Sequence, residues 1–201
     1  MGGDSVRAQI AREAARLMLE GGMRDYQAAK RKAANRLGVD ERGQMPNNVE
    51  IETAVSDYQR LFRADSQPRH LAYLRQSALS AMEFLEEFEP RLVGSVLNGT
   101  ADEHSVVELH LYLDAPEDVG LFLDARGIPY ELGEQRLRTK PEDTRHFPAF
   151  GFMAGEAPIE LVVLPYRAMR QPPLSPVTGK AMARANATKL RKLIASTNDG
   201  D

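Results

Sequence analysis

The stretch of sequence that decides the fold runs from Pro90 to Asp114 and reads PRLVGSVLNGTADEHSVVELHLYLD. Upstream of it, apolar residues recur at helical spacing, whereas from here onward they occur in short runs and in alternation. Val106 to Leu113 alternates apolar and polar side chains, which is typical of a strand with one buried face. A short apolar segment from Leu92 to Leu97 precedes it, so we predict two extended segments joined by a loop.

Four helices are predicted upstream of this stretch. The first begins near Val6 and stops at Gly21-Gly22, and the second spans Asp25 to Leu37. Asn47 is the expected N-cap of the third helix, because Glu50 three residues later completes a capping box. The fourth begins near Pro68. The side chains expected to point inward from the third helix are Ile51, Val55, Tyr58 and Phe62.

Downstream, the pattern predicts a helix capped by Asp114 and closed by Gly127, and then more strands. A last helix is expected from about Ala181 to Ala195. The further extended segments are Pro129 to Leu132, Phe147 to Met153 and Ile159 to Pro165. The sequence therefore predicts an α+β fold, with a helical region over residues 1–89 and a small mixed sheet with a C-terminal helix over residues 90–201.

Composition excludes several classes of protein. The 201 residues carry a formal net charge of -3, so a strongly basic protein is excluded, although local basic faces are not. The chain contains no cysteine, which removes disulfides, thiolate metal sites and a cysteine nucleophile. No stretch is long and apolar enough to span a bilayer, and charged residues interrupt the N-terminal segment. We therefore expect a cytoplasmic protein without a membrane partner.

Four residues in the second half are candidates for chemistry. Gly94 and Ser95 could bring the backbone close to a phosphate, or they could form an ordinary turn after a strand. Glu108 could bind a metal ion or face solvent from an alternating strand. Glu160 interrupts an apolar strand, and a carboxylate there needs either a site or an ion-pair partner. We expect His110 at the surface or in a cleft.

The order of these parts resembles the nucleotidyltransferases of the DNA polymerase beta superfamily. In these proteins Gly-Ser is followed by Asp-x-Asp on a strand and by a third carboxylate on a later strand. The chain is similar, more narrowly, to small bacterial nucleotidyltransferase-like proteins with an N-terminal helical region. The matching residues are Arg24-Asp25-Tyr26, Ala29-Lys30-Arg31-Lys32-Ala33 and the segment from Gly94 to Ala101. The resemblance covers about Ile10 to Ala195.

The resemblance implies that the protein binds a nucleoside triphosphate and transfers a nucleotidyl group to a hydroxyl. Gly94 and Ser95 would contact phosphate, and Glu108 and Glu160 would be the catalytic residues that hold Mg²⁺. The chain departs from the family pattern at Val106, which stands where the first aspartate is expected. If Asp102 or Glu103 reached the space near Glu108, catalysis would be restored. The alternative is a catalytically inactive relative, a pseudoenzyme that binds RNA or a protein partner.

Two helices carry clusters of basic residues. Such faces could hold a triphosphate or an RNA backbone, or they could be solvated helix surfaces. Because they are positively charged, Lys180 and Arg184 are expected to bind the triphosphate. The cations of the second and last predicted helices are Lys30, Arg31, Lys32 and Arg36, and Lys180, Arg184, Lys189, Arg191 and Lys192.

Overall fold

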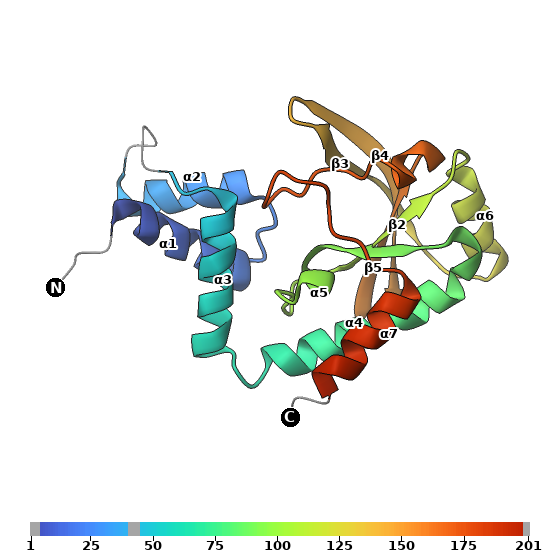
Figure 1. Ribbon diagram of the computed structural model, residues 1–201, viewed down its shortest axis with the longest axis horizontal. Helices are drawn as coiled ribbons and strands as arrows, with labels where there is room; N and C mark the ends of the chain where they lie inside the picture. The colour runs from blue at the N-terminus through green and yellow to red at the C-terminus, as the bar shows by residue number, and fades with distance from the viewer. Residues whose placement is uncertain (1–4, 40–44, 199–201) are drawn as a thin grey trace. The chain divides into compact units, whose positions relative to one another are not determined.

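The protein has an α+β fold, with a helical N-terminal part, a five-stranded mixed sheet and a C-terminal helix (Figure 1). A computed structural model describes residues 5–39 and 45–198. These residues divide into two compact units, which are described separately. The first comprises the chain up to residue 68 together with 102–104 and 176–178, and the second comprises the remainder. The predicted fold class is confirmed.

The first unit is built from three helices, α1 (Val6–Gly21), α2 (Tyr26–Leu37) and α3 (Asn48–Phe62). The predicted helix ends are present. Gly22 and Gly38 terminate α1 and α2 in the left-handed conformation, and Asp25 caps the start of α2. Both hydrogen bonds of the capping box are present: the side chain of Asn47 accepts the backbone N–H of Glu50, and the side chain of Glu50 accepts the backbone N–H of Asn47. The core is largely aliphatic, with Ile10, Leu17, Ile51 and Val55 among its buried members.

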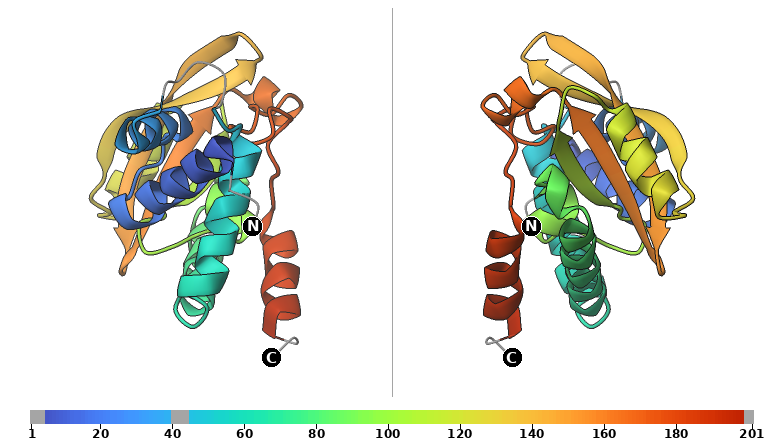
Figure 2. Two further views of the ribbon diagram at one scale, coloured as in Figure 1. Left: turned by 90° about the vertical axis from the view of Figure 1, so that its left-hand side faces the viewer. Right: turned by 90° about the vertical axis from the view of Figure 1, so that its right-hand side faces the viewer.

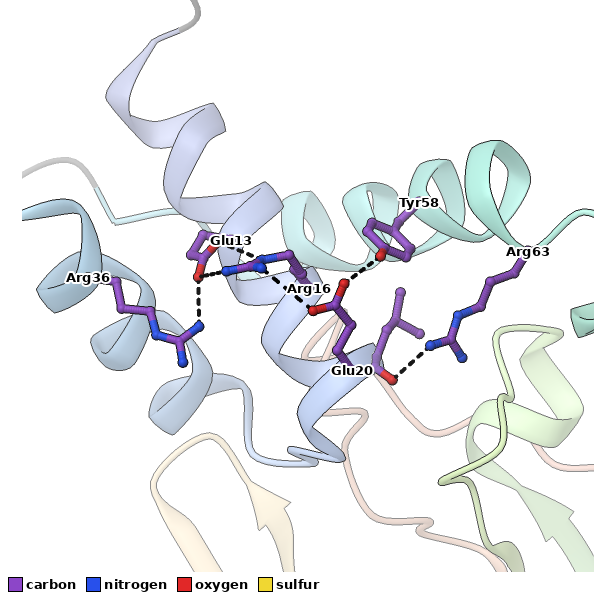
Figure 3. A network of polar contacts seen from close by, with 7 residues as sticks. Glu13, Arg16, Glu20, Arg36, Tyr58 and Arg63 are labelled. Carbon is purple, nitrogen blue, oxygen red and sulfur yellow. Dashed lines mark hydrogen bonds and ion pairs between the residues drawn. The ribbon is translucent and has the colours of Figure 1, made fainter.

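A polar network ties the helices of this unit together on one side (Figure 3). The carboxylate of Glu13 in α1 accepts hydrogen bonds from Arg16 and from Arg36 of α2, the latter at 3.0 Å. Tyr58 of α3 donates its hydroxyl to Glu20 of α1 at 2.6 Å. The prediction that Phe62 points inward is wrong, because its side chain is 70% exposed at the last turn of α3.

The second unit is organised around a sheet with strand order β1-β2-β5-β4-β3. The strands β2 and β5 are parallel, and every other neighbouring pair is antiparallel. Their bounds are β1 (Arg91–Val93), β2 (Val107–Tyr112), β3 (Glu131–Lys140), β4 (Asp143–Ala154) and β5 (Ala157–Leu164). Because β2 and β5 are central, residues near the middle of the sheet come from these two strands.

Helices cover one face of this sheet. They are α4 (Gln67–Phe84), α6 (Glu117–Ala125) and α7 (Ala187–Asn198), and their apolar side chains pack on Leu109, Leu111 and Leu161. The helices α4 and α7 lie side by side, joined by an ion pair of 2.7 Å between Glu83 and Arg191 (Figure 2). Most of α4 therefore belongs to the same compact unit as the sheet, whereas the predicted division lay between residues 89 and 90.

Several predicted elements differ from the structure, and the first is the segment from Leu92 to Leu97: it was expected to be extended, but β1 ends at Val93 and the short helix α5 spans Gly94–Asn98. The helix α6 begins at Glu117 without a side-chain cap, because Asp114 instead accepts a hydrogen bond from the backbone N–H of Tyr166 at 3.1 Å. The strand β3 is much longer than the predicted segment. The last helix begins at Ala187 rather than near Ala181, so Lys180 and Arg184 are not helical. Within the described residues, no helix has the length and apolarity to cross a membrane.

Candidate functional site

The two candidate carboxylates lie next to each other on the central strands. Glu108 of β2 and Glu160 of β5 are partners in the parallel register. Their side chains therefore project from the same face of the sheet, and neighbouring strands are about 4.8 Å apart. This is the second face, opposite the one that α4, α6 and α7 cover. Both residues are half-buried.

Gly94 adjoins this pair at the start of the short helix α5 (Gly94–Asn98), directly after β1. Its φ of 72° lies in the left-handed region, which favours glycine. Oε2 of Glu108 lies 3.7 Å from the position that a Cβ atom on Gly94 would occupy. The backbone at Gly94 thus passes close to the carboxylate. Ser95 follows within the first turn, half-buried, and its carbonyl accepts the N–H groups of Gly99 and Thr100.

His110 lies beside Glu108 on the same strand and the same face. Nε2 of His110 is 3.0 Å from Oε1 of Glu108. The expectation of a surface or cleft histidine is wrong, because the side chain is fully buried. Its Nδ1 has no hydrogen-bond partner among the described residues. One carboxylate oxygen of Glu108 is therefore engaged by a buried imidazole, while Oε2 faces Gly94.

Glu160 also has a protein partner. Oε2 of Glu160 accepts a hydrogen bond of 3.2 Å from Nε2 of Gln135, a residue of β3. In the register, Gln135 stands opposite Phe147 of β4, whereas Glu160 stands opposite Gly151, so the contact runs diagonally across β4. Sequence analysis missed Gln135, because nothing in a polar edge strand indicates that one amide will contact a strand two places away.

The position expected for a first metal-binding aspartate carries the half-buried Val106. The two carboxylates that could have replaced it are used elsewhere. Asp102 accepts the backbone N–H of His104 at 3.0 Å, and Glu103 forms an ion pair of 3.0 Å with Arg63. In the part of the chain that the structure describes, no three His, Asp or Glu side chains are grouped so that they could hold a metal ion.

The residues assigned to the triphosphate from their charge lie in the segment before α7. Arg184 donates to the hydroxyl of Tyr112 at 3.0 Å and to the carbonyl of Met169 at 3.1 Å. Its neighbour Ala185 forms one antiparallel bridge with Leu92, at the edge of β1 that faces away from β2. Lys180 is exposed. The geometry brings Gly94, Glu108 and Glu160 together, while Arg184 is held over Tyr112.

The basic helices are less available to a polyanion than their sequences indicate. Lys30 is buried, with 7% of its surface exposed, and Arg36 is bound to Glu13. On α7, Arg191 is paired with Glu83. The pKa of Lys30 is lowered, chiefly because burial disfavours its charged form. In α2, only Arg31 and Lys32 of the predicted cluster are exposed without an ion pair to a described residue.

Comparison with known proteins gives no match: no family model, curated protein or solved structure is significantly similar to this chain.

Proposed function

We propose that the protein is a nucleotidyltransferase-like protein that binds a nucleoside triphosphate together with a divalent cation, and that transfers the nucleotidyl group to a hydroxyl of an acceptor. The observation that carries this proposal is the meeting of Glu108, Glu160 and Gly94 on one face of the sheet. The resemblance in the segment from Gly94 to Ala101 supports the same reading. An activity on nucleoside triphosphates suits the cytoplasm.

The residues present suit one divalent cation better than two. Mg²⁺ is commonly held by one or two carboxylates together with substrate phosphates. Glu108 and Glu160 provide such a pair, whereas Val106 removes the carboxylate that a second ion would need. When bound, the cation would neutralise phosphate charge and orient the α-phosphorus.

Each protein group has a defined part in the proposed reaction. Gly94 lets the backbone approach the phosphates, since no side chain stands between them and Glu108. Ser95 would offer its hydroxyl to the same phosphates, and Lys180 would neutralise part of the triphosphate charge. The acceptor oxygen forms a bond to the α-phosphorus, the bond from that phosphorus to the pyrophosphate oxygen breaks, and the hydroxyl proton is released.

A second candidate function is supported by a different observation. Val106 occupies the first ligand position, and the two remaining carboxylates are hydrogen-bonded to His110 and Gln135. This arrangement favours a catalytically inactive relative that serves as a binding module. A protein partner suits it better than RNA, because the burial of Lys30 and the ion pairs of Arg36 and Arg191 reduce the basic surface of both helices.

A thermal-shift titration separates the two candidates. The protein is titrated with ATP, GTP, CTP and UTP, each with and without Mg²⁺ or Mn²⁺, because a ligand that binds only the folded state raises the melting temperature. The matched variants are Glu108→Gln and Glu160→Gln, with Glu131→Gln on the exposed edge strand β3 as control.

A metal-dependent shift that is lost in E108Q and E160Q but kept in E131Q supports the nucleotide site. Pyrophosphate release with a hydroxyl acceptor then tests transfer. If nucleotides bind but no transfer occurs with any acceptor class, the inactive module is favoured. The absence of a shift with any nucleotide at millimolar concentration contradicts nucleotide binding.

A further inference from the structure

A cavity of about 1180 Å³ lies at the end of the sheet where β2 and β5 terminate. It is bounded by the hairpin of β3 and β4 and by the turn η2 (Tyr166–Met169), which directly follows β5. Asp114 on its wall is six residues beyond Glu108, so this part of the wall is about 20 Å along the strand direction from the carboxylate pair, whereas Phe147 on another wall stands opposite Gln135, whose amide binds Glu160. Neither Glu108, Glu160 nor Gly94 lines this cavity.

Positive charge converges on this cavity from three segments. Lys140 comes from the end of β3, Arg145 from β4, and Arg167 and Arg170 from η2 and the residue after it. Of its lining residues, only Asp114 is acidic. That carboxylate is engaged by the backbone N–H of Tyr166, so it acts as a turn cap within the wall.

These cations are only partly neutralised by the protein. Arg145 shares the carboxylate of Asp143 with the hydroxyl of Thr139, at 3.0 and 2.9 Å. Arg167 and Arg170 form no ion pair or side-chain hydrogen bond with any described residue. Guanidinium groups that line a concavity without carboxylate partners are suited to bidentate binding of phosphate oxygens.

Part of the cavity lining is apolar and belongs to a packed cluster. Phe147 is buried, and Met169 and Ala168 pack on the same small cluster as Leu164. Tyr166 stands on the wall with 62% of its surface exposed. An apolar lining with a few polar groups around it is the usual composition of a small-molecule site. Ligands also bind preferentially at the carboxyl ends of parallel strands, which is where this cavity lies.

We infer that this cavity is a second anion site, which binds a small molecule with several linked phosphates through Arg167, Arg170, Lys140 and Arg145. A small ligand fits better than a nucleic acid, because these cations line one concavity instead of forming a stripe. Binding at this cavity requires neither Glu108 nor a divalent cation. The inference can therefore be tested independently of the proposed nucleotidyl transfer.

Calorimetric titration of the 201-residue chain tests the inference. The probes are tripolyphosphate, ATP, inorganic phosphate and a single-stranded oligonucleotide, all in EDTA so that the Glu108 site is not engaged through a cation. The variant is Arg167→Gln with Arg170→Gln. Its control is Arg31→Gln with Lys32→Gln, which removes the same charge from exposed positions of α2. Both pairs are exposed, so thermal melting should show both variants folded.

The wild type and the R31Q/K32Q control are expected to bind tripolyphosphate equally. R167Q/R170Q should bind it about tenfold more weakly or worse, because charge-assisted hydrogen bonds are lost. If ATP binds more tightly than tripolyphosphate, the ligand includes a base that contacts Tyr166. If the two bind equally, the site recognises the phosphate chain alone. The inference is overturned if tripolyphosphate does not bind, if both variants weaken equally, or if only the oligonucleotide binds. E108Q should retain the binding, which separates a failure here from a failure of the nucleotidyltransferase proposal.

Discussion

At the scale of single residues, Gly94 matters both for the backbone conformation and for the candidate site. It is the residue at which β1 turns into α5, its φ is 72°, and it stands beside Oε2 of Glu108. A side chain here would have to adopt the left-handed region, and it would also occupy the space through which a phosphate would approach. One position therefore serves both the fold and the candidate site.

The first prediction concerns this residue. Gly94→Ala should lower the free energy of unfolding by about 1–2 kcal/mol, since the left-handed conformation costs an L-residue that amount. Gly133→Ala is the matched control on β3, where the conformation is ordinary and a Cβ atom would meet open space. Urea unfolding followed by circular dichroism measures both. Equal stability of the two variants would contradict the argument.

The candidate site was predictable from sequence in part. The alternation in VVELHLYL places Glu108 and His110 on one face of a strand, and the apolar surroundings of Glu160 indicated that it needs a partner. The identity of the partners was not predictable. Burial of His110 depends on strands and loops distant in sequence, and Gln135 depends on the register of a hairpin that only tertiary packing defines.

At the scale of elements, helices with local signals were predicted well. Asn47 and Glu50 are three residues apart, and both halves of their capping box are present. Asp114 gave an equally good local signal, but its carboxylate caps the backbone of Tyr166, a residue brought near by the parallel pairing of β2 and β5. The strand β3 was predicted too short, since an exposed edge strand with charged residues lacks apolar alternation.

The second prediction concerns the contact between α1 and α2. Hydrogen bonds from Arg16 and Arg36 lower the pKa of Glu13 below its ordinary value of 4.5, against an opposing effect of burial. A carboxylate with a lowered pKa in the folded state stabilises the protein above its unfolded pKa, and this contribution is lost as pH falls through the folded value. Glu13→Gln should therefore cost about 1 kcal/mol at neutral pH.

Below pH 4.5 the difference between E13Q and the wild type should shrink, as the wild-type carboxyl becomes protonated. Asp57→Asn is the control, because its ion pair with Arg60 is exposed on α3 and contributes little. Urea titrations at a series of pH values give the measurement. If E13Q lowers the free energy of unfolding by the same amount at every pH, then packing, and not charge, explains how this contact stabilises the protein.

At the scale of the whole molecule, each compact unit has its own apolar core. The core of the first unit includes Ile10, and that of the second includes Leu109, both fully buried. Replacing a buried aliphatic side chain of this size by alanine typically costs about 2–5 kcal/mol. Because the cores are separate, we expect each substitution to destabilise mainly the unit that contains the substituted residue.

Native-state hydrogen exchange gives the third prediction. Ile10→Ala should accelerate exchange in α1, α2 and α3, while Leu109→Ala should accelerate it in β2 and β5. Each variant serves as the control for the other. Equal acceleration of both units by both substitutions would show that the chain unfolds as one cooperative body. In the wild type, the central strands β2 and β5 should exchange more slowly than the edge strand β3.

The exposed edge of β3 also affects how copies of the molecule behave in concentrated solution. An unpaired strand edge can add to the edge of another copy and begin aggregation. Here the edge carries both signs of charge, at Glu134, Arg136, Arg138 and Lys140, a bulge near Arg138 interrupts its register, and the carbonyl of Arg138 accepts the backbone N–H of Leu174 at 2.7 Å. The opposite edge, β1, is joined by the chain itself at Ala185. Later segments of the chain therefore bond to part of both sheet edges, and charge protects the rest of the β3 edge, so we expect the sheet to resist edge-to-edge association between neighbouring molecules.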